Sequence, residues 1–195
     1  MIFSHLNTLI FMSSPGKWSL RIGTHWRNLN GLTSLKRWPE ITIERHIWKN
    51  GEFSVTTNFG GMVNLWNYEA GSIEIELDNV VPTLTFTLGQ SHDEWEVQRH
   101  HPGVWCFLSG KLIMFTVPSY AVRHLRFDEI TKALEFWDGV VELDYDLKGV
   151  SPEGKKMQWI MPELQLRAMH AGYPICKYKN LFTYFIYPVT DLLVC

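Results

Sequence analysis

Ile41-Thr-Ile-Glu-Arg-His-Ile-Trp48 places an isoleucine at alternate positions over most of its length, and Asn50-Gly51 follows almost directly. A period of two is typical of a β-strand with one buried face. Asn-Gly is a strong short signal for the two-residue turn of a hairpin. Residues 52–59 supply a return strand that ends at Gly60-Gly61. This stretch predicts a β-hairpin and sets the expectation for the rest of the chain.

The same rhythm continues toward the carboxyl end, with turn signals at regular short intervals. Further strands are expected at 62–69, 72–78, 83–88, 95–101, 104–108, 111–117, 121–127, 133–137, 140–147, 158–169 and 181–187. Short helices are expected only near 26–35 and 127–136. The pattern predicts an all-β, antiparallel up-and-down meander of about eight to ten strands. Closure into a barrel would remove open sheet edges, and a sandwich is the alternative.

Composition sets the class of protein. The chain has 195 residues, 46% hydrophobic and 19% charged, which predicts one folded domain over 1–195 and excludes disorder. A net charge of -2 provides no positive electrostatic field that would attract nucleic acid. Cys106, Cys176 and Cys195 are too few and too scattered for a disulfide framework, which favours the cytoplasm. The aromatic content is unusual, with 9 Trp, 11 Phe and 7 Tyr, and it suggests that some of these side chains face a ligand.

Both ends of the chain are apolar. Residues 1–12 lack the basic region of a signal peptide, so residues 1–11 are expected to be a disordered or non-native extension, with Met12 as an alternative start. Residues 181–195 are interrupted by Pro188 and Asp191 and are too short to span a bilayer. No membrane span is therefore predicted.

Gly16-Lys17-Trp18 opens the first strand ahead of the meander. It resembles the G-x-W signature of the lipocalins and the wider calycin group, and Thr24-His25-Trp26 is loosely similar to the first segment of lipocalin-like bilin lyases. The resemblance implies a barrel with a ligand cavity. It gives Trp18 the role of a packing residue at the barrel floor, and it implies no catalytic residue.

The face opposite the isoleucines carries an unusual mixture of aromatic and polar residues. Tryptophan, asparagine and tyrosine together are typical of a small-molecule pocket, and an amphipathic outer surface is the alternative. The expected ligand-binding residues are Trp26, Trp48, Asn58, Asn64 and Trp66. On the same face, His46 is the expected proton-transfer group, with Glu44 as its orienting partner and Tyr68 as a hydrogen-bond donor.

These residues predict a cavity that binds a hydrophobic or aromatic small molecule. The protein is then either a carrier or a cofactor-independent cyclase, isomerase or lyase of natural-product biosynthesis. The alternatives are a self-associating structural or interaction β-domain of viral or effector type, and a carbohydrate-binding protein. A homodimer is compatible with each.

No metal or cofactor is expected. The run from Ser91 to His101 is rich in His, Asp and Glu but matches no metal-ligand spacing, and neither H-E-x-x-H nor a phosphate-binding glycine loop occurs in the sequence. Two acidic stripes, one at Glu74, Glu76 and Asp78 and one at Glu142, Asp144 and Asp146, are expected to be the solvent faces of strands. Contact with a basic partner and a calcium site are the alternatives for these stripes.

Overall fold

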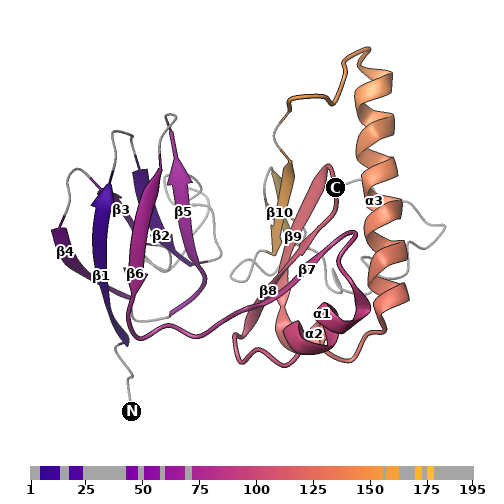
Figure 1. Ribbon diagram of the computed structural model, residues 1–195. Coiled ribbons are helices and arrows are strands. Elements are labelled where there is room, and N and C mark those ends of the chain that lie inside the picture. Colours follow the sequence, from indigo (N-terminus) through magenta and orange to yellow (C-terminus); the bar gives the residue numbers. More distant parts are fainter. Residues whose placement is uncertain are drawn as a thin grey trace. The chain divides into compact units, whose positions relative to one another are not determined.

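The computed structural model describes residues 5–13, 18–23, 43–47, 51–57, 60–68, 72–155, 157–162, 170–172 and 175–177. The chain forms two compact units, Met1–Val81 and Pro82–Cys195 (Figure 1). Each unit has its own sheets and its own hydrophobic core. The expectation of one domain over 1–195 stays a prediction.

The first unit contains two three-stranded antiparallel sheets. One has the order β4-β1-β6, with β1 at His5–Ser13, β4 at Gly51–Thr57 and β6 at Ile73–Leu77. The other has the order β3-β2-β5, with β2 at Trp18–Ile22, β3 at Ile43–Ile47 and β5 at Val63–Asn67. Much of the segment expected to be an amino-terminal extension belongs to β1, the central strand of the first sheet.

The core of this unit draws on both sheets, so the sheets pack face to face as a sandwich. Its buried members are Leu20, Ile22, Ile43, Ile47 and Val55, against which Trp18, Val63 and Ile75 pack. Trp18 is therefore a packing residue, but of a sandwich and not of a barrel floor.

The predicted hairpin at Asn50-Gly51 is wrong. β3 pairs with β2, whereas β4 pairs with β1 in the other sheet. Among the strands described in this unit, only β2 and β3 are both adjacent in sequence and paired, and the central strands β1 and β2 take their other partners from further along the chain. The up-and-down meander and the closed, lipocalin-like barrel are wrong for the same reason.

The second unit is built on a six-stranded mixed sheet of order β11-β12-β10-β9-β8-β7. The strands are β7 (Leu84–Thr87), β8 (Trp105–Ser109), β9 (Ile113–Pro118), β10 (Gln158–Pro162), β11 (His170–Gly172) and β12 (Ile175–Lys177). β7 runs parallel to β8, and β10 runs parallel to both β9 and β12, whereas the pairs β8–β9 and β11–β12 are antiparallel.

Parallel strands need a crossover connection, and helices occupy two of these connections. α1 (His92–Gln98) lies between β7 and β8, and α2 (Ser119–Val122) and α3 (Phe127–Leu147) lie between β9 and β10. α1 begins with a capping box, in which Ser91 Oγ accepts from the Glu94 backbone N–H and the Glu94 carboxylate accepts from that of Ser91. The Glu129 carboxylate accepts from the Arg126 backbone N–H at 2.9 Å at the start of α3.

The core of the second unit joins one face of the sheet to all three helices, with α3 running beside the sheet (Figure 1). Its fully buried side chains include Phe86 of β7, Leu108 of β8, Trp95 of α1, Val122 of α2 and Leu134 of α3. The Phe86 and Trp95 rings meet edge to face at 5.4 Å between centroids. The fold is a mixed α/β fold, so the all-β prediction is wrong.

The strands predicted at 95–101, 133–137 and 140–147 are wrong, because these residues lie mainly in α1 and α3. The strand predicted at 121–127 is also wrong, because α2 ends within this segment and α3 begins at its last residue. Residues 140–147 alternate, but the buried positions of α3 recur at the helical period instead. These buried positions are Ile130, Ala133, Leu134, Asp138 and Val141. Among the described residues, no helix is both long and apolar enough to span a bilayer.

Candidate functional site

The described residues of the sequence-predicted site fall on the face of sheet β3-β2-β5 that points away from the sandwich core. β2 is the central strand, so its side chains on this face meet those of both neighbours. Arg21 pairs in register with Glu44 and Asn64, and Ser19 pairs with His46 and Trp66.

Glu44 is the centre of a hydrogen-bonded network on this face. Its Oε2 accepts from Arg21 Nη2 at 2.9 Å. Its Oε1 accepts from Ser19 Oγ at 3.0 Å and from Tyr68 Oη at 3.1 Å. The side chains of Arg21 and Glu44 are 6% and 12% exposed, so this is a nearly buried ion pair.

Arg21 also lies against Trp66, with its guanidinium carbon 4.6 Å from the centroid of the ring. A guanidinium at this distance from an indole face is attracted by the ring's negative charge distribution. The indole therefore helps to hold Arg21 in place for Glu44.

The surroundings of Glu44 set its protonation. Burial by itself raises the pKa of Glu44, but the hydrogen bond and charge of Arg21, with the hydroxyls of Ser19 and Tyr68, outweigh burial and lower the pKa below its ordinary value of 4.5. The carboxylate stays ionised at neutral pH, with both oxygens already accepting hydrogen bonds. Such a group fixes its neighbours in position and is poorly suited to taking up a proton.

The structure brings together part of the predicted site. Glu44, Tyr68 and Trp66 join the Arg21 network, while His46 lies on the same face with an exposed side chain. Asn64 Nδ2 donates to the Met62 carbonyl at 3.4 Å. Trp26, Trp48 and Asn58 lie outside the described residues. The catalytic and ligand-binding roles stay predictions, but the barrel cavity that motivated them is wrong.

Ser19 and Arg21 were not among the predicted site residues. The available signal was the alternation of Trp18–Ile22, which puts Ser19 and Arg21 on the face opposite Trp18, Leu20 and Ile22. An arginine inside a buried strand requires a partner. Glu44 is that partner.

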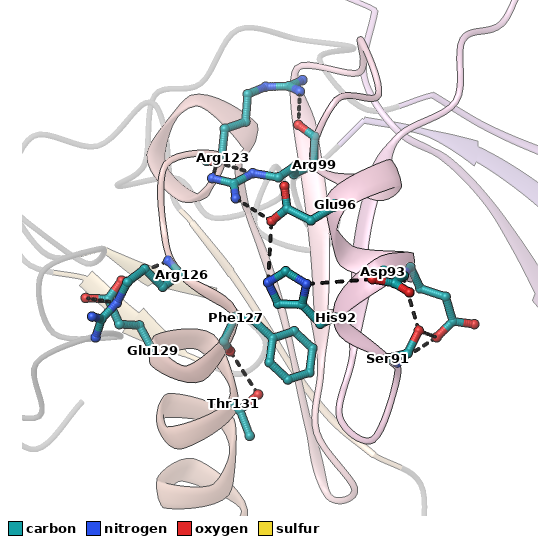
Figure 2. Close-up of polar contacts among 11 residues, drawn as sticks. Ser91, His92, Asp93, Glu96, Arg99, Arg123, Arg126, Phe127, Glu129 and Thr131 are labelled. Carbon is teal, nitrogen blue, oxygen red and sulfur yellow. Dashed lines mark hydrogen bonds and ion pairs between the residues drawn. The ribbon is translucent and has the colours of Figure 1, made fainter.

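The second unit carries a polar cluster where α1 approaches α2 and the start of α3 (Figure 2). Glu96 Oε1 accepts from Arg99 Nη1 at 2.8 Å and lies 3.9 Å from His92 Nε2. Arg99 and Arg123 donate to each other's backbone carbonyls, and Arg123 Nη2 also donates to the Gly103 carbonyl at 3.0 Å. The two guanidiniums therefore connect the end of α1 to the end of α2, and the charged side chains of Arg99 and Arg123 have a structural role.

Asp138 of α3 anchors the helix to the turn between β8 and β9. Its carboxylate accepts from the backbone N–H groups of Lys111 at 2.7 Å, Leu112 at 2.7 Å and Ile113 at 3.2 Å. Gly110 of this turn lies against the Asp138 carboxylate, and a Cβ added to Gly110 would be 2.5 Å from Asp138 Oδ1. The turn therefore requires glycine at this position.

Cys106 is a buried thiol on β8. Burial raises the pKa of Cys106 to about 12, against the weaker opposing effects of the Val117 backbone and Arg123. The thiolate is the reactive form, so we expect negligible alkylation of Cys106 by iodoacetamide in the native protein at neutral pH. Mass spectrometry of the peptide containing Cys106, with a urea-unfolded sample as the control, measures this. Equal labelling in both samples would contradict it.

The described residues contain no group of three or more His, Cys, Asp or Glu side chains placed to hold a metal ion. The full sequence also lacks H-E-x-x-H, the helical motif in which two histidines bind zinc. Among the residues that the structure describes, the donor set does not fit a catalytic metal.

The chain resembles curated proteins in sequence. It is 28% identical over 163 residues to TRPM8 channel-associated factor 2 of Bos taurus, and 27% identical over 163 residues to the TRPM8 channel-associated factor homolog of Xenopus laevis. Each alignment covers 80% of this chain and 18% of the relative, so the chain spans about a fifth of these proteins. No family model matches the chain.

Solved structures with a similar fold are M60 metallopeptidase catalytic domains. The M60 domain of Clostridium perfringens ZmpC matches with a TM-score of 0.63 and 14% identity, over 95% of this chain and 43% of that one. ZmpB metallopeptidase of the same organism gives 0.65 and 12%, over 94% and 43%. A metallopeptidase of Bacteroides thetaiotaomicron gives 0.61 and 14%, over 94% and 33%. The fold is similar to part of an M60 domain, which overturns the resemblance to lipocalins.

Proposed function

We propose that the chain is a protein-binding module that associates with an ion channel of the TRPM8 kind, built on part of an M60-like fold. The sequence similarity to the TRPM8 channel-associated factors carries this proposal. The 163 aligned residues exceed the length of either compact unit, Met1–Val81 or Pro82–Cys195, so the similarity extends over both.

The polar face of the first unit is compatible with a binding role. The Glu44 carboxylate is occupied by Arg21, Ser19 and Tyr68, so it acts on the shape and rigidity of the sheet. Fixed side chains favour recognition, because little conformational freedom is lost on binding. This proposal replaces the small-molecule cyclase and the viral or effector domain, neither of which agrees with the M60-like fold.

Co-purification tests the proposed function. The full chain, carrying an affinity tag, is co-expressed with the TRPM8 channel, and the channel retained after detergent extraction is quantified by immunoblot. We expect retention well above that obtained with an unrelated tagged β-sandwich protein. Equal retention on both tagged proteins, or equal retention of an unrelated cation channel, would overturn the proposal.

A further inference from the structure

α3 carries an apolar stripe that is not part of the core of its own unit. The stripe consists of Phe136, Val140, Leu143 and Leu147, which are spaced four, three and four residues apart. These side chains are 42%, 39%, 58% and 80% exposed. Residues at this spacing lie above one another along one side of a helix.

The stripe lies on the side of α3 away from its buried face. At 3.6 residues per turn, its members cluster within a narrow sector of the helix. The buried Leu134, Asp138 and Val141 lie roughly opposite, and the buried Ala133 borders the stripe. The helix is thus apolar on two sides, and only one side is explained by the core.

Acidic residues flank the stripe. α3 holds seven acidic residues and one basic residue, a formal charge of 1 − 7 = −6. Glu135, Glu142 and Asp146 are exposed along one flank. On the other flank, Asp144 Oδ2 lies 2.5 Å from Nζ of Lys148, which is the C-cap residue of the helix.

We infer that this stripe is the docking surface for a cationic amphipathic helix of a partner protein. This inference rests on the proposed binding function and identifies the surface that carries it. Apolar positions spaced alternately by four and three residues match the seam along which two helices pack. The acidic flank selects lysine and arginine beside that seam. A second copy of α3 would bring two helices of charge −6 together, so charge disfavours self-association as the explanation.

Two synthetic peptides test the charge selection. One consists of Leu-Lys heptads matched to α3 in length, and the other replaces every lysine with glutamate while keeping the leucine face. Fluorescence anisotropy of each labelled peptide is followed as the full 195-residue chain is added. We expect saturable binding of the Leu-Lys peptide that weakens as salt is raised, and no binding of the Leu-Glu peptide. Equal binding of the two peptides overturns the inference.

Variants locate the surface. Leu143→Gln with Leu147→Gln should weaken Leu-Lys peptide binding by about tenfold or more. The matched control Val97→Gln, at an exposed valine of α1, should bind as the original chain does. Glu135→Lys with Glu142→Lys should lose the Leu-Lys peptide and gain the Leu-Glu peptide. Circular dichroism checks that each variant keeps its helix content.

Two further outcomes overturn the inference. One is unchanged peptide binding by a folded Leu143→Gln, Leu147→Gln variant. The other is a dimer of the original chain, seen by sedimentation velocity, that this variant abolishes. The proposed function and the proposed surface can fail independently. If the channel co-purifies equally with the original and variant chains, the surface is wrong and the function stands. If the Leu-Lys peptide binds as expected but no channel is retained, the function is wrong and the surface stands.

Discussion

Replacement of Glu44 by glutamine will lower the free energy of unfolding by about 3 kcal/mol, the cost expected when one partner of a buried ion pair is removed. The amide can still accept from Ser19 and Tyr68, but the Arg21 guanidinium, in a side chain only 6% exposed, loses its counter-charge. Urea denaturation measures the loss, and hydrogen exchange should locate it in β2 and β3.

Two variants serve as controls for the Glu44 prediction. Arg45→Met changes an exposed neighbour on the same strand and should alter stability by no more than about 0.5 kcal/mol. The double variant Arg21→Met, Glu44→Leu removes both charges and should be much less unstable than the sum of its single variants. Additive losses would show that the ion pair is not the source of the effect.

The lowered pKa of Glu44 gives the same network a pH dependence. A carboxyl group with a lowered folded-state pKa contributes stability that is present above its ordinary value of 4.5 and is lost as pH falls through the lower folded-state pKa. The stability difference between the original chain and Glu44→Gln should therefore shrink on acidification below pH 4.5. A difference that is constant from neutral pH to well below that point would contradict the assignment.

Gly110→Ala will destabilise the second unit by about 3 kcal/mol, because the new methyl group collides with the carboxylate that holds the β8–β9 turn. Its Cβ would lie 2.5 Å and 2.6 Å from the two Asp138 oxygens, so the carboxylate must move away from its three backbone donors. Thermal unfolding followed by circular dichroism measures the loss.

Gly139→Ala is the matched control for Gly110→Ala. Gly139 lies next to Asp138 on α3, and an added Cβ there meets nothing within 4 Å. Alanine is the better helix former by about 1 kcal/mol, so this variant should stabilise the protein. If the collision is the cause, Gly110→Ala should also cost less in an Asp138→Ala background. A full loss in that background would disprove the proposed contact.

Strand positions in the first unit were largely predictable from the sequence. Alternation identified β3, β5 and β6 to within about two residues of their ends, because each strand buries one face. Pairing was not predictable in the same way. Asn50-Gly51 favours a tight turn between neighbours, yet β3 and β4 belong to different sheets. The apolar burial gained when two sheets cover one core outweighs the local preference of Asn-Gly for a tight turn.

Helix α3 shows a second limit. Val140-Val-Glu-Leu-Asp-Tyr-Asp-Leu147 alternates like a strand, and its alternation comes from two apolar sectors on one helix. Val141 and Tyr145 belong to the core side, and Val140, Leu143 and Leu147 belong to the exposed stripe. A period of two can arise whenever a helix is apolar on opposite sides. Only the longer run from Phe127 reveals the helical period.

The candidate site was predictable in its location but not in its organisation. Face sorting brought Glu44, Trp66 and Tyr68 together, and the structure joins them. The pairing of Glu44 with His46 was inferred from their closeness along one strand. Arg21 reaches Glu44 from the neighbouring strand, and that register cannot be derived from either strand alone.

The parallel pairing of β9 with β10 has a consequence for how the chain folds. Ile113 of β9 is matched with Gln158 of β10, and α2 and α3 lie between them. Helices form from local contacts, whereas this strand pair must first close a long loop. Until residues 158–162 are available, β9 keeps one side of its backbone unpaired. During synthesis on the ribosome, that open strand is a place where the nascent chain is exposed to association with another molecule.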